Sequence, residues 1–220
     1  MIIEGYEAKT EEVLIGARTI PFIKVRNLEG LVDRDALLSD DSEEPPYWAH
    51  LWTGSLTLVH YVDSRVLVHG KNVLDLGCGL GLVGTVAALK GGNVTFADKE
   101  RDALAFARQN ASLNGCLNTQ TTFVDFTVSN LHRRYPIILG AEVLYERPTF
   151  PQIIIFLRRH LEIGGLAIFA DAHRTNTEEF YQALDRNYFE WTKEQFDEVE
   201  EGVPLKVDIV IVKHGDKGTP

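Results

Sequence analysis

Three aspartates occupy equivalent places in the chain, each within or directly after a short apolar segment. Asp75 lies in Val73-Leu-Asp-Leu-Gly, Asp98 ends Val94-Thr-Phe-Ala-Asp, and Asp125 follows Thr122-Phe-Val. Segments of this kind that alternate with helical patterns predict parallel strands, whose carboxyl ends meet at one edge of a sheet. Ligands of open α/β sheets bind at that edge, and an acid after the second strand can accept the hydroxyls of a ribose. The spacing therefore predicts one pocket lined by three carboxylates.

A glycine-rich turn follows the strand that carries Asp75. It reads Leu76-Gly-Cys-Gly-Leu-Gly-Leu-Val-Gly84, and glycine lets the backbone turn tightly and approach a ligand closely. Gly79, Gly81 and Gly84 match GxGxxG, the pattern with which dinucleotide-binding enzymes hold a pyrophosphate at a helix N-terminus. This match alone is weak, because a tight turn without a ligand has the same glycines.

S-adenosylmethionine is the other ligand that such a turn could hold. It has no phosphate but carries a sulfonium, an ammonium and a carboxylate, so its site should place an acid near the turn. Asp75 stands two residues before Gly77 and gives D-x-G-x-G. Asp98 is compatible with either ligand, and each aspartate, Asp125 above all, could instead cap a helix. An NAD-dependent oxidoreductase therefore stays an alternative at this point.

The D-x-G-x-G turn resembles the first motif of the Rossmann-like, seven-strand methyltransferases. This resemblance implies that S-adenosylmethionine is the cofactor. It also implies that Asp125 contacts the adenine amino group, that Phe126 packs on the adenine ring, and that Trp52 and Gly54 border the methionine end. The cofactor-binding residues that we predict are Trp52, Gly54, Asp75, Gly77, Cys78, Gly79, Gly81, Asp98, Lys99, Asp125, Phe126 and Ala141.

Glu142 and Tyr145 follow the fourth predicted strand, whose carboxyl end should face the methyl group. A carboxylate can orient an incoming amine, and an aromatic ring adds cation–π attraction of roughly 0.5–2 kcal/mol. We therefore predict Glu142 and Tyr145 as the catalytic residues; the alternative is that Glu142 caps the segment that follows it and Tyr145 packs in the core. Asp171-Ala-His-Arg174, after the fifth strand, could touch a substrate or form an ordinary loop.

Pro46-Tyr-Trp-Ala-His-Leu-Trp-Thr-Gly54, together with Glu142-Val-Leu-Tyr145, resembles the seven-strand protein lysine methyltransferases. That group includes the enzyme acting on the electron-transfer flavoprotein β subunit, and its usual motif is Asp-x-x-Tyr. The resemblance covers residues 45–175 and implies N-methylation of a lysine on a protein substrate. Glu142 is one methylene longer than the usual Asp, so a small-molecule amine acceptor and a non-catalytic module remain alternatives. Trp48 and Trp52, four residues apart, could also form a single core stripe.

The predicted fold class is α/β, a doubly wound and mostly parallel seven-stranded sheet with helices on both faces and an N-terminal β-hairpin extension. We predict a hairpin and acidic connector over 1–44, packed on a methyltransferase domain over 45–213, and a flexible tail over 214–220. The hairpin lies within 11–28 and a helix within 47–61. The other predicted strands are 72–76, 94–97, 121–124, 136–139, 165–170, 191–198 and 206–213, and the other helices are 81–89, 100–114, 150–161 and 177–185.

The composition excludes several classes of protein. The net charge of -10 disfavours nonspecific nucleic-acid binding and suits a cationic partner, and acids concentrate in 29–44 and 190–201. Cys78 and Cys116 are too few for a disulfide scaffold, and no histidine or cysteine spacing indicates a metal. We expect a cytoplasmic protein, because neither a signal peptide nor a membrane span of about 20 apolar residues is present.

Overall fold

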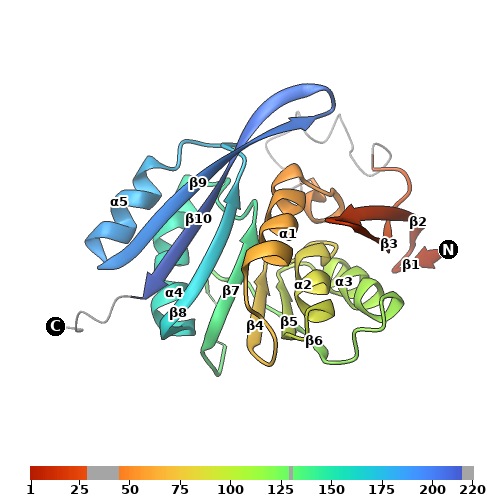
Figure 1. Ribbon diagram of the computed structural model, residues 1–220, viewed down its shortest axis with the longest axis horizontal. Coiled ribbons are helices and arrows are strands. Elements are labelled where there is room, and N and C mark those ends of the chain that lie inside the picture. Colours follow the sequence, from red (N-terminus) through yellow and green to blue (C-terminus); the bar gives the residue numbers. More distant parts are fainter. Residues whose placement is uncertain (29–44, 129–130, 215–220) are drawn as a thin grey trace.

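Seven strands form the central sheet of the computed structural model, which describes residues 1–28, 45–128 and 131–214 (Figure 1). Their order is β6-β5-β4-β7-β8-β10-β9, and the five strands from β6 to β8 are parallel. β10 pairs antiparallel with both β8 and β9. The strands are β4 Asn72–Leu76, β5 Asn93–Asp98, β6 Thr119–Phe123, β7 Tyr135–Ala141, β8 Leu161–Asp171, β9 Phe189–Glu200 and β10 Val203–His214. The predicted mostly parallel seven-stranded sheet is confirmed.

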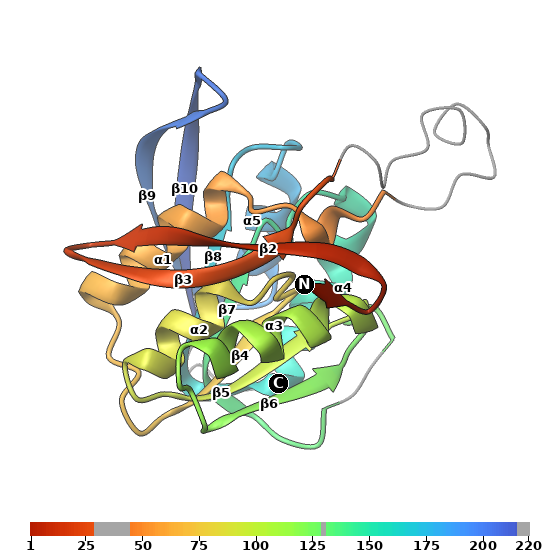
Figure 2. The ribbon, with the colours of Figure 1, turned by 90° about the vertical axis from the view of Figure 1, so that its right-hand side faces the viewer.

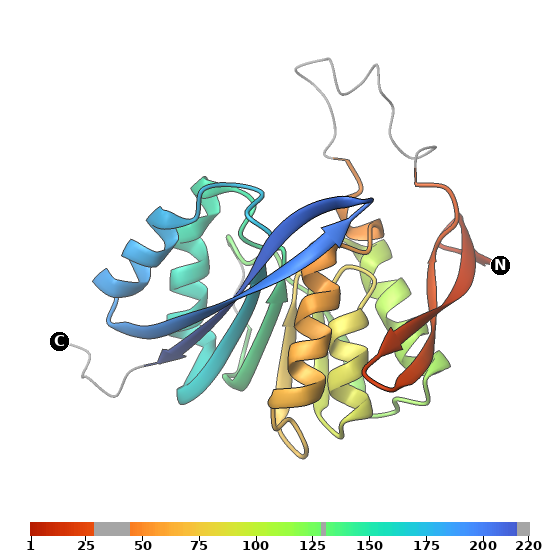
Figure 3. The ribbon, with the colours of Figure 1, turned by 45° about the horizontal axis from the view of Figure 1, so that its top comes forward.

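Helices cover both faces of this sheet (Figure 3). On one face lie α1 Thr53–Arg65, α2 Leu82–Leu89 and α3 Arg101–Leu113; on the other lie α4 Phe150–His160 and α5 Glu178–Arg186. Each face buries its own apolar cluster, because the central strands point side chains alternately to the two sides. In β4, for example, Val73 packs with the first helix group and Leu74 with the second. The fold is therefore doubly wound, as predicted.

The N-terminal segment forms a separate antiparallel sheet of β1 Ile2–Ile3, β2 Tyr6–Ile15 and β3 Arg18–Val25. This sheet lies across the outer side of α1 and α3 (Figure 2). Asn110 of α3 is fully buried beneath it, where Oδ1 accepts a hydrogen bond from the N–H of Ile23 and Nδ2 donates to the carbonyls of Ile23 and Leu80. One side chain thus joins the predicted hairpin to the glycine-rich turn.

The predicted helix within 47–61 is wrong at its start. Residues Tyr47–Ala49 form a single 3-10 turn, η3, and α1 begins only at Thr53. Trp52 is extended, with φ -72° and ψ 149°, and Gly54 lies inside the helix. The chain therefore crosses the end of the sheet in an extended form before it turns into α1.

The C-terminal hairpin is longer than the sequence indicates. β9 and β10 pair continuously, and their tip at Glu201-Gly202 extends past Asp208, which pairs with the last residue of β8. His214 is the final residue of β10 rather than part of a tail. The predicted acidic connector, 29–44, and the rest of the predicted tail lie outside the described residues. Among the helices of the described residues, none is both long and apolar enough to cross a bilayer.

Candidate active site

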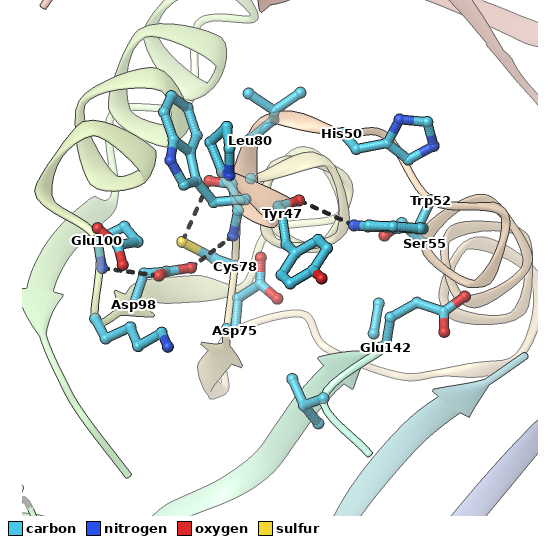
Figure 4. Close-up of a pocket in the computed structure, with 18 of the residues that line it drawn as sticks. Tyr47, His50, Trp52, Ser55, Asp75, Cys78, Leu80, Asp98, Glu100 and Glu142 are labelled. Atoms are coloured by element: carbon cyan, nitrogen blue, oxygen red, sulfur yellow. Dashed lines mark hydrogen bonds between the residues drawn. The ribbon is translucent and has the colours of Figure 1, made fainter. Parts of the chain in front are cut away.

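A cavity of about 820 Å³ opens at the carboxyl ends of the central strands (Figure 4). The chain runs from β4 outward through β5 to β6 and then returns to place β7 on the other side of β4. This reversal of strand order leaves a crevice between the loops after β4 and β7, the usual ligand site of open α/β sheets. The fold alone therefore predicts where a ligand lies.

The glycine-rich turn forms the floor of this cavity. Gly77, Gly79 and Gly81 have φ values of 62°, 50° and 80°, a left-handed conformation that residues with a Cβ adopt at a cost. A Cβ on Gly77 would also lie 2.7 Å from Cγ1 of Val143. The turn is thus packed directly against the loop after β7, and α2 begins immediately after Gly81.

Asp75 lies near the end of β4, in the wall of the cavity, and is only 2% exposed. Its Oδ2 atom accepts a hydrogen bond of 2.8 Å from the N–H of Gly84 in α2. Burial raises the pKa of this carboxyl to about 7, although the Gly84 N–H opposes that shift. A cation placed beside Asp75 would favour the ionised form, so this residue is suited to a positively charged ligand.

Asp98 is the last residue of β5 and faces the far end of the cavity (Figure 4). Oδ2 accepts the N–H of Gly79 at 2.9 Å, and Oδ1 accepts the N–H of Glu100 at 2.9 Å. Burial raises its pKa, and these two backbone donors oppose the rise. Each carboxylate oxygen can accept a second hydrogen bond, so Asp98 retains acceptor capacity for ribose hydroxyls.

Asp125 and Phe126 border the same end of the cavity. The Oδ1 atom of Asp125 accepts hydrogen bonds from the N–H and the hydroxyl of Thr127, at 2.9 and 2.6 Å. It therefore caps a turn after β6, which partly agrees with the alternative interpretation as a cap. Even so, Asp75, Asp98 and Asp125 line one cavity, as the sequence predicts.

Glu142 stands at the opposite end of the cavity and has a strained backbone, with φ 56°. Its Oε1 atom accepts the N–H of Gly54 at 3.1 Å, and Oε2 lies 3.5 Å from the N–H of Ala172. The side chain is 6% exposed, and burial raises its pKa, while Arg174, 3.7 Å away, lowers it. Glu142 is therefore a cap, as the alternative interpretation held, but it caps the earlier helix α1 and not the segment that follows it. It also lines the cavity.

Aromatic side chains surround the end of the cavity where Glu142 lies. Trp52 donates from Nε1 to the carbonyl of Tyr47, and the Tyr47 ring lies 6.1 Å from the ring of Tyr145. Trp48 also borders the cavity, but it packs edge-on against Tyr6, at 5.3 Å, and joins the hydrophobic core cluster. The interpretation of Trp48 and Trp52 as one core stripe is therefore wrong, because only Trp48 joins the packed aromatic group.

All but one of the predicted site residues line the cavity. The exception is Gly54, which lies behind Glu142 and whose N–H is already used by that carboxylate. Sequence reasoning missed Tyr6, Tyr47 and Glu100, which also line it. Glu100 could be predicted from the sequence, because it stands two residues after Asp98. Tyr6 could not, because it arrives from the separate N-terminal sheet. Among the described residues, no three histidine, cysteine or acidic side chains converge as metal ligands.

Comparison with known proteins identifies the family of this chain. Residues 46–198 match the protein family described as tellurite resistance protein TehB. A mouse protein named EEF1A lysine methyltransferase 3 is 32% identical over 157 residues, which cover 68% of this chain and 67% of that protein. The chain belongs to the TehB-like family of S-adenosylmethionine-dependent methyltransferases. The alternative of an NAD-dependent oxidoreductase is therefore wrong.

Two further relatives are also named as methyltransferases, and one of the two names gives lysine as the acceptor. A zebrafish protein N-lysine methyltransferase METTL21A is 34% identical over 142 residues, which cover 60% of this chain and 63% of that protein. A probable S-adenosyl-L-methionine-dependent methyltransferase TehB from Haemophilus influenzae is 26% identical and matches 80% of this chain. The chain thus spans about two thirds or less of the length of these relatives.

Solved structures share the fold. The YcgJ protein from Bacillus superposes with a TM-score of 0.61 at 11% identity, over 72% of this chain and 98% of that one. Magnesium protoporphyrin IX methyltransferase from Synechocystis, solved with bound S-adenosylhomocysteine, gives 0.59 at 16% identity, over 72% and 81%. Both comparisons support the Rossmann-like methyltransferase architecture of the sheet.

The residues in the cavity fit S-adenosylmethionine. The buried carboxyl of Asp75, whose pKa burial raises to about 7, suits the ammonium or sulfonium, and Asp98, with Glu100 nearby, suits the ribose hydroxyls. Asp125 and Phe126 offer an acceptor and an apolar surface for an adenine. The lining from Asp98 to Glu142 would thus place a nucleoside at one end and the methyl group near the other. These individual contacts remain predictions.

Proposed function

We propose that this enzyme transfers a methyl group from S-adenosylmethionine to the side-chain amine of a lysine on a protein substrate. The observation that carries the proposal is Glu142, a buried carboxylate with a strained backbone at the end of the cavity opposite Asp98. Trp52 and Tyr145 stand beside it in the cavity wall. An anionic group flanked by aromatic rings suits a cation on a long apolar stem, which is the shape of lysine.

S-adenosylmethionine, when bound, supplies an electrophilic methyl group. The residues of this chain must then hold the acceptor nitrogen in line and allow it to lose a proton. A lysine ammonium has a reference pKa near 10.4, so it arrives charged and is attracted to Glu142. Because burial raises the pKa of Glu142, this carboxylate is a better proton acceptor than an exposed glutamate. Tyr145 and Trp52 border the path along which the side chain would enter.

The names of the relatives support a protein lysine, since the mouse and zebrafish proteins are called lysine methyltransferases. The net charge of -10 is also suited to a basic protein partner. We further propose a reducing, cytoplasmic setting, in keeping with the free thiols of Cys78 and Cys116.

The test is labelling of a lysate from the source cells with tritiated S-adenosylmethionine, followed by mass spectrometry of the labelled band. We expect a protein with methylated lysine, whose label is lost with Glu142→Ala and strongly reduced with Glu142→Gln. Glu179→Ala is the matched control, because Glu179 is an exposed acid on α5, away from the cavity. Label found only in small molecules, or a Glu142→Ala variant as active as the wild type, would contradict the proposal.

A further inference from the structure

A closed ring of polar contacts lies at the acceptor end of the site. Arg174, in the loop between β8 and α5, has Nη2 2.7 Å from Oε1 of Glu200 and 3.7 Å from Oε1 of Glu142. Glu200 also accepts the hydroxyl of Thr53 at 2.8 Å, and Glu142 accepts the N–H of Gly54. Because Thr53 and Gly54 are consecutive, the ring closes on the first turn of α1.

The ring brings together elements that are far apart in the sequence. Glu200 comes from the end of β9, and the hairpin of β9 and β10 leans over the N-terminal end of α1 (Figure 3). Glu142 follows β7, on the other side of β8. Arg174 is the only member that contacts both acids, so it connects the hairpin to the acceptor carboxylate.

Arg174 touches the outer side of the cavity wall. Its guanidinium carbon lies 5.1 Å from the centroid of the Trp52 ring, a cation–π distance. Among the described residues, the cavity lining includes Trp52 and Glu142 but neither Arg174 nor Glu200. Arg174 is therefore placed to hold two cavity residues from behind rather than to contact a ligand.

The charges of the ring do not cancel. Glu142 and Glu200 are two acids around one guanidinium, and Arg174 is the largest cause that lowers the pKa of Glu200, to about 2. Asp171, at the end of β8, is the other charged group that acts on Glu142, and it raises the pKa of Glu142, whereas Arg174 lowers it. The ring thus keeps an excess negative charge next to Trp52, where a cationic acceptor would be attracted.

We propose that Arg174 is a positioning residue, which fixes the Glu142 carboxylate and the Trp52 ring for a cationic acceptor and is itself anchored by Glu200 of the hairpin. The inference rests on the proposed function for the identity of the acceptor. It goes further by assigning acceptor binding to a contact that the β9–β10 hairpin controls. We expect the ring to affect donor binding little, because the carboxylate that we predict for the ribose, Asp98, lies at the opposite end of the cavity.

The test compares Arg174→Met and Arg174→Lys with Arg65→Met. Arg65 is a matched control, because it also joins α1 to the hairpin, through Glu194 at 2.5 Å, and lies over the Tyr61 ring, but away from the cavity. The first readout is the titration of the Glu142 carboxyl by carbon-13 NMR, with Glu142→Gln identifying the signal. We expect Arg174→Met to raise the midpoint by about one pH unit. Arg174→Lys should give a midpoint close to that of the wild type, and Arg65→Met should leave the midpoint unchanged.

The second readout is steady-state kinetics with the acceptor and donor varied separately. Arg174→Met should raise KM for the acceptor roughly tenfold, as expected for loss of a charged contact, and leave the affinity for S-adenosylhomocysteine within about twofold. Glu200→Gln, which removes the anchor without altering Arg174 or Glu142, should raise the same KM and serves if Arg174→Met folds poorly. An unchanged NMR midpoint, an equal shift in Arg65→Met, or an equal loss of donor affinity would overturn the inference.

The two proposals fail in different ways. If the wild type methylates no protein lysine and Arg174→Met still shifts the Glu142 midpoint, the lysine acceptor is wrong and the positioning role stands. If lysine methylation occurs while neither the midpoint nor the acceptor KM responds to Arg174→Met, the positioning role alone is wrong.

Discussion

The N–H of Gly54 donates a hydrogen bond to Oε1 of Glu142, so the Glu142 carboxylate also caps the N-terminus of α1. The first N–H groups of a helix have no partner inside it, and the helix dipole favours an anion there. This one contact connects the segment before β4 with the loop after β7, two parts of the chain that are 88 residues apart. This hydrogen bond thereby helps to stabilise Glu142 in its strained backbone conformation.

Replacement of Gly54 by alanine should therefore separate catalysis from folding. The new Cβ would lie 2.5 Å from Oε1 and 2.9 Å from Cδ of Glu142, so the carboxylate must move away. The backbone tolerates alanine, which favours a helix over glycine by up to about 1 kcal/mol. We expect methyl transfer to fall at least roughly tenfold, a barrier increase of about 1.4 kcal/mol, with little change in thermal stability or in S-adenosylhomocysteine binding.

The control for that substitution is Ser64→Ala, an exposed change near the other end of α1. It should alter neither rate nor affinity. A Gly54→Ala enzyme with wild-type turnover would show that the position of the Glu142 carboxylate does not matter for the reaction.

Asp98→Ala should weaken binding of S-adenosylhomocysteine about 10–100-fold, because hydrogen bonds to a charged group are worth roughly 1.5–3 kcal/mol. The change also leaves the N–H of Gly79 without its acceptor and loosens the glycine-rich turn. Calorimetry measures the affinity, and thermal unfolding shows how much of the loss is structural. Glu100→Gln is the comparison: if it costs more affinity than Asp98→Ala, the ribose is held by Glu100 instead.

Asp75→Asn should change how stability depends on pH. The pKa of Asp75 rises from 3.8 in the unfolded chain to about 7 in the folded one, so the folded state binds the extra proton between these values. Its contribution is therefore fully present below pH 3.8 and is lost as the pH rises through about 7. Asparagine resembles the protonated acid and still accepts the N–H of Gly84. As the pH rises across this range, the free energy of unfolding of the variant should therefore increase relative to that of the wild type, by at most about 1.4 kcal/mol per pH unit.

Urea unfolding at a series of pH values measures that difference. Glu142 and Asp171, whose pKa values are also raised, titrate in both proteins and cancel in the comparison. A stability difference that stays constant from pH 4 to 7 would mean that Asp75 is ionised in the folded protein throughout this range, so that its carboxylate carries a permanent negative charge.

The sequence predicts the fold well because its strongest signals are local. The strand that carries Asp75 was placed at 72–76, as observed, since a buried parallel strand is a continuous apolar run with a glycine turn after it. The start of α1 was misplaced, because Trp48 and Leu51 continue the helical pattern while the backbone is held extended at Trp52. Patterns of side chains predict which face is buried, but they do not show where an extended crossing interrupts a helix.

The sequence predicts the site residues that lie at strand ends, but not the contacts that depend on how far an element extends. The sequence predicts Asp75, Asp98 and Glu142 because each lies at or next to the end of a strand, and topology brings strand ends together. Arg174 and Glu200 were not assigned to Glu142, because their meeting depends on how far the β9–β10 hairpin extends over α1. No pattern within either segment predicts a contact between a loop and the end of a distant strand. For the same reason, the cap formed by Glu142 is predicted on the segment that follows it rather than on α1.

Asn110 offers the last test, because it supports the site from outside. It is fully buried and satisfies three backbone groups, the N–H and carbonyl of Ile23 and the carbonyl of Leu80. Asn110→Ala leaves these groups without partners in an apolar setting, which costs about 1–3 kcal/mol for each group that stays dry. Since water can reach some of them, we expect a loss of roughly 2–4 kcal/mol in the free energy of unfolding.

The same substitution should also reach the cofactor. Leu80 lies between Gly79 and Gly81, so loss of its partner frees the turn that lines the cavity. We expect S-adenosylhomocysteine to bind several-fold more weakly at a temperature where the variant is fully folded. Asn114→Ala is the matched control one helical turn later, since Asn114 also donates to the N-terminal sheet, at the carbonyl of Pro21, but from an exposed position. Asn110→Ala could instead lower stability and still bind S-adenosylhomocysteine with the same affinity as Asn114→Ala and the wild type. In that case the N-terminal sheet stabilises the fold without shaping the glycine-rich turn.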